Sequence, residues 1–71
     1  MRVSRRQPLD QIPRIAEATA RAEESLDHRG RVFLRYSGTE PLLRILVEGF
    51  DAALVERLAD ELEATARAEL S

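Results

Sequence analysis

Cysteine, lysine and tryptophan are all absent from this sequence of 71 residues. Without cysteine the chain has no disulfide bond, no thiolate metal ligand and no thiol nucleophile. No apolar run approaches the roughly 18–20 residues that span a membrane. Residues 1–6 also lack the apolar stretch of a signal peptide. We therefore expect a soluble, cytoplasmic protein with no membrane partner.

The charge balance argues against a nucleic-acid partner. Eleven basic residues stand against thirteen acidic ones, which gives a net charge of −2, whereas a nucleic-acid surface normally has a basic excess. All eleven basic residues are arginine, whose guanidinium group matches phosphate and carboxylate geometry. No group of Asp, Glu and His has metal-ligand spacing, so no metal site is expected. The single histidine, His28, is expected at the surface.

Chain length limits the chemistry further. Residues 1–71 amount to one domain, and a chain this short buries only about 60% of its unfolded surface. A deep catalytic cleft is therefore excluded unless other domains complete it.

Hydrophobic spacing in the first half predicts a strand followed by a helix. Residues 1–6 alternate weakly, as in a short strand, and Pro8 then marks a turn. Asp10 is the expected N-cap of a helix that stops at Gly30. Its apolar residues recur every three or four positions, as in an amphipathic helix. They are Ile12, Ile15, Ala16, Thr19, Ala22 and Leu26.

The second half predicts a hairpin and a second helix. Strands over residues 31–36 and 42–50 flank a turn at 37–41. Asp51 caps a helix to about residue 70, with Phe50 and Val55 as a hydrophobic staple. The buried stripe of this helix comprises Leu54, Val55, Leu58, Leu62, Ala66 and Leu70. The predicted fold class is α+β, in the order β-α-β-β-α. It has two layers: a small antiparallel sheet, with strand order 2-3-1, and two helices on one face.

The hairpin register sorts its two faces. Opposed residues in an antiparallel pair share a face, so their numbers have a constant sum. A sum of 79 gives a wholly apolar face, with the pairs Val32–Val47, Leu34–Ile45 and Tyr36–Leu43. The other face then holds the pairs Arg31–Glu48, Phe33–Leu46 and Arg35–Arg44.

The Arg35–Arg44 pair is the unusual feature of this register. Like charges directly opposed on a sheet are destabilising by a few tenths to about 1 kcal/mol. An anion between the guanidinium groups would reverse that effect, and the neighbouring loop offers neutral donors from Ser37, Gly38 and Thr39. The alternative is two arginines extended into water beside an ordinary turn. On the same face, Phe33 and Leu46 form either a small exposed patch or a covered seam.

The run from Gly30 to Gly49 resembles a known signature. It contains an arginine, one variable residue, Ser37-Gly38-Thr39-Glu40-Pro41, two more residues, Arg44, and a strand that ends in Glu48-Gly49. This pattern is similar to the C-terminal domain of bacterial phosphoglucosamine mutases, in the α-D-phosphohexomutase superfamily, and the likeness covers nearly the whole chain. Tyr36 occupies the variable position.

The resemblance implies both a fold and a role. The fold is TBP-like. The family interconverts the 6-phosphate and 1-phosphate of an amino sugar, and its fourth domain holds the phosphate that is not reacting. The phosphate and substrate contacts would fall on Arg35, Ser37, Gly38, Thr39 and Arg44. Glu40 is expected to turn its carboxylate away from the phosphate.

The family's catalytic motifs are missing from this chain. It contains neither the catalytic loop Thr-Ala-Ser-His-Asn, the magnesium loop Asp-Gly-Asp-x-Asp-Arg, nor the sugar-reading Gly-Glu-x-Ser-Gly-His. We therefore expect residues 1–71 to be the C-terminal domain alone, cut at its N-terminal edge. It would have no catalytic residue and no metal, while Mg²⁺ would act in the full enzyme. Its expected partners are a phosphosugar and the other domains of the same polypeptide.

Three alternatives stay open. The first is that the domain belongs to another phosphohexomutase, a phosphomannomutase or phosphoglucomutase. The second is that it is a free-standing anion-binding module. The third is that it is an interaction domain that uses the face of Phe33 and Leu46.

Overall fold

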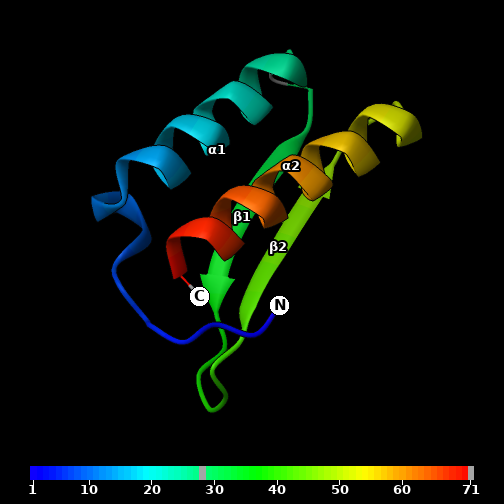
Figure 1. The fold of residues 1–71 in the computed structure, drawn as a ribbon. Helices are drawn as coiled ribbons and strands as arrows, with labels where there is room; N and C mark the ends of the chain where they lie inside the picture. Colours follow the sequence, from blue (N-terminus) through cyan, green and yellow to red (C-terminus); the bar gives the residue numbers. More distant parts are fainter. Residues whose placement is uncertain (28, 71) are drawn as a thin grey trace.

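A computed structural model of the chain describes residues 1–27 and 29–70 and has two layers (Figure 1). One layer is an antiparallel hairpin, and the other consists of two helices that cross one of its faces. The expected α+β class is confirmed. The elements are the 3-10 turn η1 (Leu9–Gln11), the helix α1 (Pro13–Ser25), the strands β1 (Arg31–Tyr36) and β2 (Leu43–Glu48), and the helix α2 (Ala52–Leu70).

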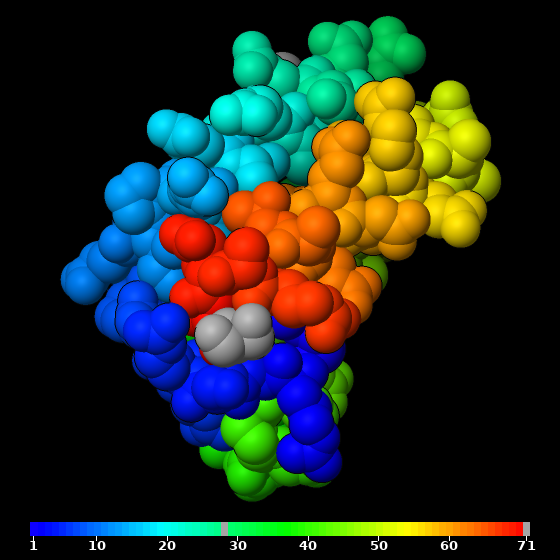
Figure 2. All heavy atoms as spheres, viewed as in Figure 1, coloured from blue at the N-terminus to red at the C-terminus, as the bar shows by residue number. Residues whose placement is uncertain are grey.

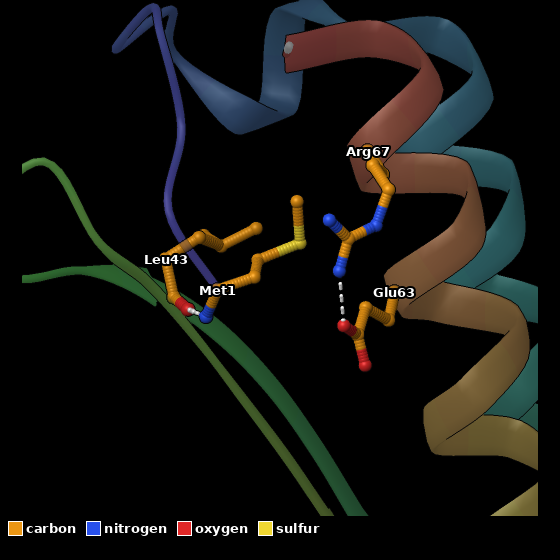
Figure 3. A network of polar contacts seen from close by, with 4 residues as sticks. All are labelled: Met1, Leu43, Glu63 and Arg67. Carbon is orange, nitrogen blue, oxygen red and sulfur yellow. Dashed lines mark hydrogen bonds and ion pairs between the residues drawn. The ribbon is translucent and has the colours of Figure 1, made fainter.

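The N-terminal segment lies on the edge of β2, as the predicted strand order requires. The Met1 nitrogen donates a hydrogen bond to the Leu43 carbonyl at 2.8 Å, and the Leu43 N–H donates to Met1 O at 2.8 Å (Figure 3). Figure 3 also shows the Met1 side chain extending toward the Glu63–Arg67 ion pair on α2, whose N–O distance is 2.6 Å.

This segment is not the strand over residues 1–6 that was predicted. It forms only the isolated bridge between Arg2 and Leu42, so the sheet has two strands. The Ser4 N–H donates instead to the Leu70 carbonyl at 3.0 Å. That bond directs the backbone to the end of α2 and away from the sheet.

The prediction that Asp10 caps the first helix is wrong. Asp10 lies within η1, and α1 begins at Pro13. Proline suits the first helical position because its φ is already helical and its missing N–H would have had no partner there.

The first helix also ends differently from the prediction. Asp27, at φ 53°, takes the left-handed conformation that commonly ends a helix. Gly30 has a steric role instead, since a Cβ at this position would lie 2.0 Å from the Glu48 carbonyl oxygen.

The start of α2 confirms one prediction and contradicts another. The Leu54 N–H donates to Asp51 Oδ1 at 3.2 Å, which is the expected N-cap bond. The side chain of Phe50 is 90% exposed, however, so it forms no staple with Val55.

The core fills the space between the helices and one face of the hairpin. Leu34 and Ile45 pack against both of its clusters. The first cluster comprises Val3, Ile12, Ile15, Leu43, Ala66 and Leu70, and the second comprises Ala22, Leu26, Leu58 and Leu62. Ala16 was predicted to be buried but is exposed. No described helix combines the length and apolar character that crossing a bilayer requires.

Candidate functional site

The strand register confirms the cross-strand arginine pair. Arg35 and Arg44 are direct partners in the β1–β2 ladder, one position from the loop end of the hairpin, and both are exposed. Within residues 1–27 and 29–70 neither guanidinium group has a hydrogen-bond or ion-pair partner. Two uncompensated positive charges therefore stand side by side on the outer face of the sheet.

A hollow of about 240 Å³ opens beside these arginines. It is lined by Arg35, Tyr36, Ser37, Gly38 and Arg44. Four of the five predicted site residues thus surround one space. The fifth, Thr39, is exposed on the same loop but does not line the hollow.

The loop backbone offers fewer donors than the sequence suggests. The Ser37 N–H is already used, because it donates to the Leu42 carbonyl at 2.8 Å. The N–H groups of Gly38 and Thr39 donate to no acceptor in the described part of the chain. Gly38 has open space around it and no positive φ, so its backbone conformation here does not require glycine.

The N-terminal segment holds both ends of this loop, which the sequence did not reveal. On one side the Val3 N–H donates to the Pro41 carbonyl at 2.9 Å, and an Arg6 guanidinium nitrogen donates to the Glu40 carbonyl. On the other side the Tyr36 hydroxyl donates to the Gln7 carbonyl at 2.6 Å. In Figure 2 the N-terminal segment, in blue, covers part of the green hairpin end.

Arg6 also brings a third positive charge close to the hollow. This charge and partial burial act in opposite directions on the pKa of the Tyr36 phenol. Partial burial raises the pKa of Tyr36 above its usual 10.0, and the positive charge of Arg6 lowers it by a smaller amount. Arg6 and Gln7 lie about thirty residues from their loop partners along the chain, and no periodic signal in the sequence connects segments so far apart.

Among the described residues, no carboxylate side chain lines the hollow. Glu40 does not line the hollow and takes part through its backbone carbonyl. The part of the chain that the structure describes holds no group of three or more His, Cys, Asp or Glu side chains able to bind a metal. The predicted surface position of His28 lies outside the described residues.

The fold and the hairpin end together define a small α+β domain with an arginine pair beside a Ser-Gly-Thr loop. The chain belongs to the phosphoglucomutase/phosphomannomutase C-terminal domain family, whose model matches residues 1–65.

Several curated relatives are named phosphoglucosamine mutase. The protein from Solidesulfovibrio magneticus is 55% identical over 67 residues, which cover 93% of this chain and 15% of that protein. The protein from Desulfovibrio desulfuricans is 46% identical over 70 residues, covering 99% of this chain and 16% of that protein. No solved structure gives a significant match. The chain thus spans about 15% of the length of these relatives, which are phosphohexomutases, a class of isomerase.

Proposed function

We propose that this chain is the phosphate-binding domain of a phosphoglucosamine mutase and that it holds the non-reacting phosphate of the phosphosugar. The proposal rests on the opposed pair of Arg35 and Arg44, which has no anionic partner in residues 1–27 and 29–70. The two arginines line one hollow with Ser37 and Gly38.

The chemistry of the hollow favours a phosphate monoester. Each guanidinium group can donate two parallel hydrogen bonds to phosphate oxygens. The Ser37 hydroxyl and the Gly38 N–H add neutral donors without an opposing carboxylate. The bound anion would also remove the repulsion between the two arginines. Because the net charge of the chain is −2, attraction of the phosphate depends on this local pair rather than on the overall charge.

In this proposal the rest of the reaction belongs to other domains. The enzyme would interconvert glucosamine 6-phosphate and glucosamine 1-phosphate, with a phosphoryl-donor serine and Mg²⁺ held by motifs that this chain does not contain. The chain by itself would therefore not turn over substrate. The family model also names phosphoglucomutase and phosphomannomutase, which keeps a different hexose phosphate as the second candidate ligand.

The proposal can be tested by titrating the ¹⁵N-labelled chain with inorganic phosphate at low ionic strength. We expect the largest shift changes at Arg35, Ser37, Gly38, Thr39 and Arg44. Arg44→Ala should weaken binding by about tenfold or more, as for the loss of charged hydrogen bonds. Arg14→Ala is the matched control, because Arg14 is exposed on α1 and its loss changes the net charge equally. Equal weakening by both variants, or shifts elsewhere, would contradict the proposal.

A further inference from the structure

The outer face of the hairpin carries an uncovered apolar pair. Phe33 and Leu46 are direct partners in the ladder, and their exposed fractions are 52% and 49%. Both helices pack on the opposite face, against Leu34 and Ile45. Two adjoining apolar side chains this exposed at the centre of a sheet face form a candidate contact surface.

This pair lines a second hollow, which adjoins the first. The second hollow has a volume of about 370 Å³ and is lined by Phe33, Leu34, Arg35, Arg44 and Leu46. Arg35 and Arg44 also line the hollow at the loop, so the two spaces share a cationic wall. Side chains two positions apart on a strand are about 6.6–6.8 Å apart. A ligand held at the arginines therefore extends over Phe33 if its body turns away from the loop.

The arginine pair beside the apolar pair determines which kind of ligand fits the two hollows. This ligand must have a compact anionic group at one end, to compensate the two arginines, and apolar surface about 6.6–6.8 Å from that group. A phosphate-bearing pyranose ring meets both requirements. Its ring faces carry C–H groups, and these can pack on the weakly negative face of an aromatic ring.

We infer that Phe33 and Leu46 form a platform for the C–H face of the sugar whose phosphate lies between Arg35 and Arg44. This inference rests on the proposed function and adds a sugar contact to it. The platform has no donors or acceptors of its own, so it does not read individual hydroxyl groups.

The test compares two phosphate monoesters that differ in the ring. Methyl phosphate and glucose 6-phosphate are titrated separately into the ¹⁵N-labelled chain. We expect glucose 6-phosphate to bind about four- to fifteenfold more tightly, as for one to two methylene equivalents of buried apolar surface. Phe33→Thr, which keeps strand propensity, should bring the two affinities within twofold while leaving that for methyl phosphate unchanged. Phe33→Tyr should restore the difference.

The control is Phe50→Thr, which removes another exposed phenylalanine and should leave the ratio of affinities intact. A ratio near one in the unaltered chain, or a ratio that survives Phe33→Thr, would overturn the inference. So would concentration-dependent dimerisation that Phe33→Thr abolishes, because the platform would then be a self-association surface. If neither ester shifts the arginine and loop signals, the proposed function itself is wrong. If methyl phosphate binds there and only the ratio fails, the sugar platform alone is wrong.

Discussion

The hydroxyl of Tyr36 donates a hydrogen bond to the backbone carbonyl of Gln7 at 2.6 Å. This contact joins the last residue of β1 to a segment that precedes α1. Together with the bond from Arg6 to the Glu40 carbonyl, it holds the two flanks of the hairpin loop against the N-terminal segment. The loop is thus supported by residues far from it in sequence.

Tyr36 should make the stability of the chain depend on alkaline pH. The folded state raises the pKa of its phenol above 10.0, so the folded chain holds this proton more tightly than the unfolded chain. The resulting stabilisation is fully present below about pH 10 and is lost as the pH rises through the folded-state pKa. Lysine and cysteine are absent, and Tyr36 is the only tyrosine in the sequence.

Urea unfolding between pH 8.5 and 11.5 checks this prediction. We expect the free energy of unfolding to fall above pH 10 in the unaltered chain and to stay level in Tyr36→Phe. At pH 7 the variant should be less stable by about 0.5–1 kcal/mol, because one partly exposed hydrogen bond is lost. An equal decline in both proteins would mean that Tyr36 is not the group responsible.

Arg44→Ala should leave the ligand-free chain equally stable or stabilise it by a few tenths to about 1 kcal/mol, because it removes a like-charge pair. Arg31→Ala is the matched variant on the same face, where Arg31 opposes Glu48; it should be neutral or slightly destabilising. Thermal melts at low salt give both values. A loss of more than about 1 kcal/mol for Arg44→Ala would show that this arginine is structural.

Gly30 and Gly38 should respond in opposite ways to alanine. A Cβ at position 30 would meet the Glu48 carbonyl oxygen at 2.0 Å, whereas a Cβ at position 38 meets nothing within 4 Å. Gly30→Ala should therefore destabilise by more than about 2 kcal/mol. Gly38→Ala should change stability by less than about 0.5 kcal/mol, because its backbone needs no positive φ. Chemical denaturation of the two variants in parallel measures the contrast, and similar losses would disprove it.

Asp51→Ala should destabilise the chain by about 1 kcal/mol through loss of the cap on the Leu54 N–H. The control is Asp60→Ala, within α2 and exposed, which should be neutral or mildly stabilising because alanine favours helix interiors. Circular dichroism melts of both variants provide the measurement. If the two variants melt alike, the carboxylate of Asp51 has no capping role.

The hairpin and its arginine pair could be predicted because one rule decides them. In β1 and β2 an odd sum of opposed residue numbers keeps the apolar residues on one face, and the sum of 79 also sets Arg31 against Glu48. That register fixes Arg35 opposite Arg44 as a consequence. The buried stripe of α2 could be predicted from helical periodicity in the same way. The capping role of Asp51 could be predicted because this residue lies just ahead of that stripe.

Features that depend on tertiary contacts could not be predicted. Nothing in the local sequence shows that Ser4 will donate to Leu70, and the weak alternation of residues 1–6 alone predicts a strand. The sequence predicts the wrong ends for α1, because Asp10 and Gly30 are good local signals for a helix start and a helix end. In the structure the helix begins at Pro13, and Asp27 takes the left-handed conformation after its last turn. The role of Tyr36 was missed because its partner, Gln7, offers only a backbone carbonyl, which every residue has.

The attachment of the N-terminal segment has a mechanical consequence. Pulled from Met1, the chain would pass tension first to Leu43, through the two bonds between Met1 and Leu43, and then to Pro41, through the bond from Val3. Any larger body tethered ahead of Met1 would therefore pull on the residues that flank the loop when it moved. The shape of the arginine hollow would then change with the tension in that tether.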